Sequence, residues 1–153
     1  MFSDSDWATS RIDRRSISGY LSLFANGPVS WSSRKQPTVA LSTMEAEFMA
    51  LASATCEAIW LRELSSELGV QDQGPISINV DNDAAMMFPQ SVMFHARSKH
   101  IDIRYHFVRE RVASNEVKLN HCASEDNLAD IFTKPLLRPL FEKLRNQIMS
   151  HSA

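Results

Sequence analysis

Four carboxylates lie at positions where divalent-metal chemistry is feasible, each in a different segment of the chain: Asp4, Glu47, Asp81 and Asp130. Two divalent cations about 3.5–4 Å apart need several carboxylates that converge from different elements. Magnesium prefers hard oxygen ligands and keeps some of its water, so a set of aspartates and glutamates suits it better than zinc. The residue types therefore indicate a two-magnesium site, on condition that the fold brings the four side chains together.

Glu47 lies near the start of the longest helical pattern. Ser42 and Glu45 have the spacing of a capping box, so Glu45 has a structural role at the helix N-terminus. Glu47 has no cationic partner at helical spacing and lies beside the apolar stripe. A carboxylate there is costly unless something pairs with it, and a metal ion is one candidate. The alternative is that Glu47 leans out to solvent at the edge of the stripe.

The other three acids also have simpler interpretations. Asp81 follows an alternating strand pattern, at the kind of strand end where α/β folds assemble their sites, but it could equally cap a following helix. Asp130 could be one exposed charge on a short helix, and Asp4 and Asp6 could be solvated charges near the terminus. Separation along the chain says nothing about separation in space, so the sequence leaves these alternatives open.

The order of the predicted elements indicates one mixed α/β domain that begins with a hairpin at Asn26-Gly27. Apolar alternation predicts strands at 19–24, 29–32, 76–80 and 116–120. Helical spacing, caps and breakers predict helices at 43–68, 82–88, 98–113, 125–133 and 136–149.

Composition is that of one ordinary globular domain, with 153 residues of which 44% are hydrophobic and 22% charged. A net charge of -2 provides no global basic field, so any nucleic-acid binding must come from a local patch. No apolar run approaches the roughly 18 residues of a membrane span, and the N-terminus lacks signal-peptide features. Cys56 and Cys122 lack zinc-site spacing and are expected to be reduced. An intracellular protein, cytoplasmic or nuclear, with no membrane partner is expected.

Several runs of sequence resemble the ribonuclease H domain of copia-type retrotransposon Pol polyproteins. They occur in the order of that family, and they are SDSDWA at 3–8, SWSSRKQ at 30–36, LSTMEAEFMA at 41–50, DN at 81–82, KHIDIRYH at 99–106 and LADIFTKP at 128–135. The two runs at 99–106 and 128–135 are highly specific, whereas the Asp-Asn pair alone is weak. The resemblance predicts a ribonuclease H-like domain over 1–137 and a C-terminal helix or tail over 138–153.

The resemblance implies a mixed five-stranded sheet of order 3-2-1-4-5 flanked by helices. It also implies endonucleolytic cleavage of the RNA strand of RNA–DNA hybrids with two Mg²⁺ ions, or Mn²⁺ in their place. Matching the motifs position by position assigns catalysis and metal binding to Asp4, Glu47, Asp81 and Asp130, with Asp4 chosen over Asp6 because the family's acid is the earlier of the pair. Asp4 would bridge both ions, Glu47 and Asp81 would complete one site, and Asp130 would complete the other. The implied partners are the hybrid and, at full length, an upstream reverse transcriptase and integrase.

Basic side chains around the run at 99–106 are the candidates for contact with nucleic-acid phosphates: Arg97, Lys99, His100 and Arg104, with Arg34 and Lys35 as weaker candidates. The alternative is a solvated helix face, since Asp102 and Glu110 lie among the bases. Large aromatic residues at apolar spacings are expected in the core rather than on stacking surfaces, and they are Trp7, Trp31, Trp60 and Tyr105.

Only three residues precede Asp4, whereas the first strand of the family begins several residues earlier. A truncated first strand that holds Asp4 loosely is therefore expected, as in a fragment of a longer polyprotein. The alternative function, of a different class, is a catalytically inactive retrotransposon-derived fragment that keeps the fold and weak nucleic-acid binding.

Overall fold

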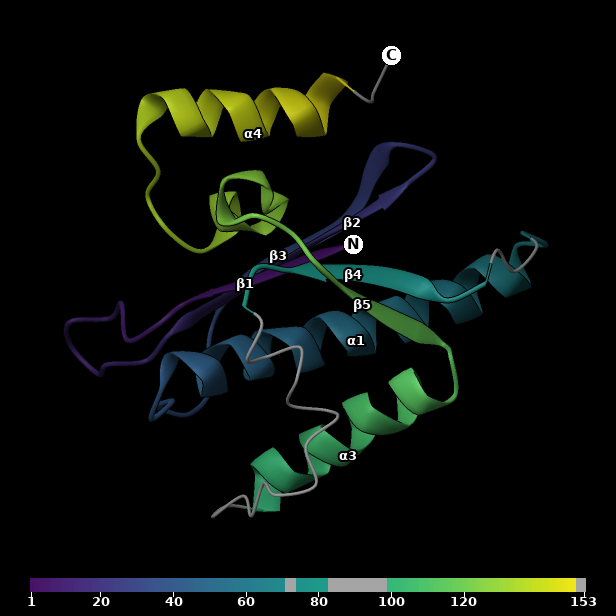
Figure 1. Ribbon diagram of the computed structural model, residues 1–153, viewed down its shortest axis with the longest axis horizontal. Coiled ribbons are helices and arrows are strands. Elements are labelled where there is room, and N and C mark those ends of the chain that lie inside the picture. Colours follow the sequence, from purple (N-terminus) through teal and green to yellow (C-terminus); the bar gives the residue numbers. More distant parts are fainter. Residues whose placement is uncertain (71–73, 83–98, 151–153) are drawn as a thin grey trace.

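The computed structural model describes residues 1–70, 74–82 and 99–150 (Figure 1). The strands are β1 (Phe2–Asp6), β2 (Ile17–Phe24), β3 (Gly27–Lys35), β4 (Ile76–Val80) and β5 (Val117–His121). The helices are α1 (Thr43–Glu67), α3 (Lys99–Ala113) and α4 (Arg138–Ser150), with two short 3₁₀ turns, η2 (Ser124–Asp126) and η3 (Leu128–Phe132). The helix expected at 82–88 lies almost entirely outside the described residues.

The strands form one sheet of order β3-β2-β1-β4-β5, which confirms the predicted order. β1 pairs antiparallel with β2, and β2 pairs antiparallel with β3. The β1–β4 and β4–β5 pairs are parallel, so the sheet is mixed. Helices α1 and α3 cover one face, while α4 and η3 cover the other (Figure 1).

Central strand β1 is held unequally by its two neighbours. Its five residues all pair with β2, from Phe2 opposite Leu21 to Asp6 opposite Ile17. Towards β4 the ladder has one register pair, Phe2 with Asn79, beside a hydrogen bond from the Asn79 amide to the Met1 carbonyl at 2.9 Å. β1 and β4 therefore part before their carboxyl ends, which is the kind of opening where α/β sheets place ligands.

The strand is shorter than β2 and β3, as expected, with 5 residues against 8 and 9. Asp4 nevertheless lies within the fully paired part of β1 and is only 1% exposed. The short strand thus leaves Asp4 buried and paired with β2, rather than at a frayed end.

Two apolar clusters hold the layers together. Phe48 of α1 and Val108 of α3 pack with Ile78 of β4 on one face. On the other face Leu144 of α4 packs with Leu21 of β2. Burying a side chain of this size contributes about 1.5–3 kcal/mol. None of the helices within the described ranges is long and apolar enough to cross a membrane.

Local signals place most element ends, with small shifts. The Ser42 hydroxyl accepts a hydrogen bond from the Glu45 amide at 3.1 Å, as a helix N-cap should. Glu45 in turn accepts from the Leu41 amide at 2.8 Å, one residue before the Ser42 amide that a standard capping box uses. The helix ends at Glu67 and is followed by Gly69 at φ +77°.

Two local expectations need correction. The hairpin turn consists of Ala25 and Asn26, at φ 48° and 65°, so it lies one residue before the expected Asn26-Gly27 pair. Both central residues of such a two-residue loop need positive φ, and Asn26 meets this need more easily than Ala25. The segment expected as one helical turn at 125–133 forms the two 3₁₀ turns, because the Asn127 side chain caps η3 and interrupts the run.

The expectation that the tryptophans are core residues was wrong. Trp7, Trp31 and Trp60 are 44%, 60% and 53% exposed, whereas Tyr105 is buried as expected. Trp31 lies on edge strand β3, and Trp60 follows Ala58, the last buried residue of α1. Helical and strand spacing identify a face, but they do not reveal where along an element the packed core ends.

Candidate active site

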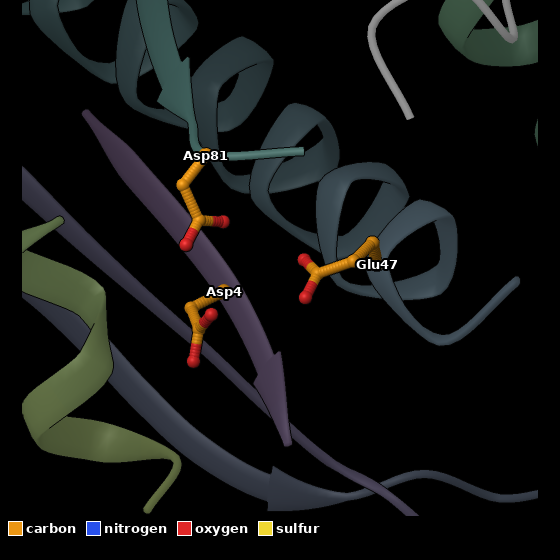
Figure 2. Close-up of side chains that lie close together, drawn as sticks. All are labelled: Asp4, Glu47 and Asp81. Atoms are coloured by element: carbon orange, nitrogen blue, oxygen red, sulfur yellow. The ribbon is translucent and has the colours of Figure 1, made fainter. Parts of the chain in front are cut away.

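Three of the four predicted acids converge at the opening between β1 and β4. Asp4, Glu47 and Asp81 each offer a carboxylate oxygen, and these oxygens all lie within 4.8 Å of one another. Figure 2 shows Asp4 on β1, Asp81 just beyond the end of β4, and Glu47 reaching towards both from α1. Glu47 also accepts a hydrogen bond from the Ser5 amide at 3.3 Å, which connects α1 to β1 beside Asp4.

Asp130 lies on the other side of Asp4, carried by η3. The Lys134 ammonium joins the two acids, with Nζ 3.0 Å from Asp130 Oδ1 and 3.8 Å from Asp4 Oδ1. The Thr133 hydroxyl donates a hydrogen bond to Asp4 Oδ2. Asp130 therefore belongs to the same site, although it is not in the group of three whose oxygens lie within 4.8 Å. Asp6 is not in that group either, in agreement with the choice of Asp4.

Burial rules out the simple interpretations of three acids. Asp4 is 1% exposed, Asp130 is 2% exposed and Glu47 is 9% exposed. Asp4 is thus no solvated terminal charge, Asp130 is no exposed charge on a short helix, and Glu47 does not lean out to solvent. The helix that Asp81 could cap falls in residues outside the described ranges.

Burial and mutual repulsion make the site unfavourable for negative charge. Burial raises the pKa of Glu47 to about 8, and the charges of Asp4 and Asp81 add to the rise. Burial likewise raises the pKa of Asp130 to about 7, with Asp4 adding to the rise and Lys134 opposing it. The pKa of Asp4 is also raised, again mainly by burial. A cation among these acids would favour their ionised forms, and an all-oxygen donor set is of the kind that magnesium prefers.

Asn127 and Gly19 position η3, and motif analysis identified neither residue. Asn127 is fully buried, and its Nδ2 donates to the Ser3 carbonyl at 2.9 Å while its Oδ1 accepts from the Ala129 amide at 3.1 Å. Gly19 lies opposite Asp4 in the sheet, and a Cβ there would approach Thr133 Cγ2 to 2.7 Å. The Asn127 side chain thus attaches η3 to β1, the strand of Asp4. The absence of a side chain at Gly19 lets η3 approach the sheet.

Replacing Asn127 with alanine is expected to lower the free energy of unfolding by about 2–3 kcal/mol, because two buried hydrogen bonds are lost and the Ser3 carbonyl loses its partner. Chemical denaturation measures the loss, and Asn146→Ala on exposed surface of α4 is the control. A stability within about 0.5 kcal/mol of wild type would show that Asn127 does not hold η3 in place.

The predicted nucleic-acid contacts separate into different groups. Arg34 and Arg104 line one groove of about 670 Å³ together with Trp60 and Phe107. Lys35 instead pairs with Asp13 at 3.3 Å on the surface. Arg97 lies outside the described residues, as do the side chains of Lys99 and His100, which begin α3. The groove lies along α1 beyond Glu47: its α1 residues run from Ala52 to Trp60, about 8–20 Å further along the helix axis.

Strand order and flanking helices together define a ribonuclease H-like fold. A comparison with protein-family models finds no match. Among curated proteins the chain is 40% identical over 147 residues to the "Retrovirus-related Pol polyprotein from transposon RE1" of Arabidopsis thaliana, covering 96% of this chain and 10% of the relative. It is 38% identical over 151 residues to the corresponding polyprotein from transposon TNT 1-94 of Nicotiana tabacum, covering 99% of this chain and 11% of the relative.

The chain thus spans about a tenth of the length of the curated relatives it matches. Nearly all of it is related to one segment of the Pol polyproteins of copia-type retrotransposons, which confirms the resemblance seen in the motifs. The names of these relatives do not state which activity of the polyprotein the segment carries.

Proposed function

We propose that this chain is a metal-dependent endonuclease that hydrolyses the RNA strand of RNA–DNA hybrids during retrotransposon reverse transcription. The observation that carries the proposal is the convergence of Asp4, Glu47 and Asp81 at the opening between β1 and β4, with Asp130 beside them. Support comes from the ribonuclease H-like strand order and from the relation to Pol polyproteins.

The roles of the acids follow from their positions. Asp4, Glu47 and Asp81 would hold one magnesium ion, and Asp4 with Asp130 would hold a second. Bound magnesium supplies a water of lowered pKa and neutralises charge on the leaving oxygen. Burial of Asp4 and the hydrogen bond from the Ser5 amide to Glu47 fix the orientation of both carboxylates, so these two side chains need little reorganisation when the ions bind.

Hybrid cleavage in the presence of magnesium tests the proposal. An end-labelled RNA strand paired with DNA should be cut internally to fragments with 5′-phosphate and 3′-hydroxyl ends, and EDTA should stop the reaction. Single-stranded RNA and duplex DNA are the substrate controls. If the protein unfolds cooperatively yet leaves the hybrid intact at saturating magnesium, the proposed nuclease function is wrong. The protein is then better described as a catalytically inactive retrotransposon-derived fragment.

The groove between the helices and the sheet is the proposed contact for the hybrid backbone. Arg34 and Arg104 would contact phosphates, and the exposed face of Trp60 offers an apolar surface for sugars or bases. Glu57 also lines the groove, but its carboxylate accepts a hydrogen bond from Ser30. Two arginines and one glutamate leave the groove lining with a net positive charge.

Changing both Arg34 and Arg104 to alanine is expected to weaken hybrid binding by about tenfold or more and to reduce the slope of log K against log salt by about 2. Binding is measured by fluorescence anisotropy in the Asp81→Asn background, so that the hybrid stays intact. Lys35→Ala is the matched control, since Lys35 adjoins Arg34 in sequence but pairs with Asp13. An equal loss for Lys35→Ala would show that general surface charge, not the groove, binds the hybrid.

A further inference from the structure

Lys134 provides a positive charge inside the acidic cluster. Its Nζ lies 3.0 Å from Asp130 and 3.8 Å from Asp4, and both of these carboxylates are buried. Other lysine pairs in the described residues differ in setting: Lys143 pairs with Asp126 at 2.7 Å and Lys35 with Asp13 at 3.3 Å, both with surface carboxylates. Lys134 therefore compensates charge that solvent cannot reach.

The position of the ammonium is that of a cation shared by two carboxylates. It contacts the Asp4–Asp130 side of the cluster, where the proposed function places the second divalent ion. Among the described residues, no ion pair links a cation to Glu47 or to Asp81. The two sides of the site thus differ: Lys134 lies closest to Asp130, at 3.0 Å, and is farther from Asp4, the acid that both sides share, at 3.8 Å.

We propose that Lys134 is a built-in cation of this site, which offsets part of the charge on Asp4 and Asp130 when only one divalent ion is bound and which the second divalent ion must displace. The inference rests on the proposed function only for the identity of the metal site. Lysine suits this role because its ammonium is a compact charge on a flexible four-carbon stem. Its side chain is 32% exposed, so it has an open direction in which to swing away.

Unequal binding of the two ions follows from this arrangement. The first ion meets Glu47 and Asp81, and it shares only Asp4 with Lys134, whose Nζ lies 3.8 Å away. The second must push an ammonium away from Asp4 and Asp130, and the energy of that contact is subtracted from its binding. Charges at 3–4 Å near a protein surface interact strongly enough to change affinity by roughly tenfold or more. Activation at low magnesium would then be limited by the second ion.

Manganese binding to the intact chain, followed by electron paramagnetic resonance and calorimetry without nucleic acid, tests the proposal. Wild type should bind one ion and then a second at least about tenfold more weakly. Lys134→Met should tighten the second ion by about tenfold or more and change the first much less. Lys143→Met is the matched control, removing a lysine from a surface pair, and both of its affinities should equal those of wild type. Lys134→Arg keeps the charge and should also keep the weak second ion.

A thermal melt in EDTA provides a second readout. Lys134→Met should melt at a lower temperature than wild type there, because Asp4 and Asp130 lose their cation, and manganese should then raise its melting temperature by more than it raises that of wild type. Unchanged binding in Lys134→Met, or equal tightening of both ions, would overturn the inference. Manganese binding as predicted in a protein that cleaves no hybrid would instead contradict the proposed nuclease and leave the role of Lys134 standing. Absence of any manganese binding would overturn both.

Discussion

Replacing Asp81 with asparagine is expected to lower the rate of hybrid cleavage by about a thousandfold or more, equivalent to about 4 kcal/mol of transition-state stabilisation. The substitution keeps the size of the side chain but replaces one of three converging carboxylates with a neutral amide. A neutral amide oxygen is a weaker ligand for a hard cation, so the ion is lost or misplaced. Single-turnover cleavage with labelled RNA measures the rate.

Asp13→Asn is the matched control for this substitution. It makes the same chemical change on an exposed acid that pairs with Lys35 outside the cluster. Its cleavage rate should lie within a small factor of wild type. Asp81→Asn should also be no less stable than wild type in EDTA, because removing one charge relieves repulsion on Asp4 and Glu47. A fully active Asp81→Asn protein would contradict the assigned role of Asp81.

Stability of the metal-free protein should fall as pH rises from about 5 to about 8, and magnesium should restore it. Glu47 has an ordinary pKa of 4.5 and a folded-state pKa of about 8, and Asp130 has 3.8 and about 7. Between these values the folded state binds more protons than the unfolded state, so the free energy of unfolding decreases with pH. The stabilisation is complete below the unfolded pKa values and is lost as pH rises through the folded ones. The expected loss is about 2 kcal/mol or more.

Chemical denaturation at pH 5, 6, 7 and 8, with EDTA or with saturating magnesium, measures this dependence. Magnesium binds the ionised site, so its stabilisation should be largest at pH 8 and small at pH 5. Glu47→Gln cannot ionise at this position and should flatten the pH dependence in EDTA. A slope that is the same in Glu47→Gln and wild type would show that Glu47 ionises without cost in the folded protein.

Much of the fold could be predicted from local signals, whereas the assignment of the acids to one site came from the family resemblance. The Ser42 cap and Gly69 placed the beginning and end of α1, and the alternating run at 76–80 placed the strand that precedes Asp81. The distinction between Glu45 and Glu47 also held, because a capping role is visible in the sequence. Glu45 accepts from the Leu41 amide, whereas Glu47 lies in the acidic cluster.

Features that depend on docking between remote segments could not be predicted. Asn127 contacts Ser3 across 124 positions, and Thr133 contacts Asp4 across 129. The sequence around Asn127 and around Thr133 gives no indication of the residue that each contacts. Lys134 did leave a signal, since it lies four residues after Asp130, but the spacing alone looks like an ordinary helical ion pair. Its approach to Asp4 appears only when η3 packs over Gly19.

The location of bound manganese in crystals is the most direct test of the metal site on which this function depends. Anomalous scattering from crystals grown with manganese should show its strongest peak between the carboxylates of Asp4, Glu47 and Asp81, within about 2.5 Å of an oxygen from each. A second, weaker peak is expected between Asp4 and Asp130, with Lys134 displaced. No peak at the three acids under saturating manganese, or a strongest peak elsewhere on the molecule, would contradict the assignment of this cluster as a metal-dependent nuclease site.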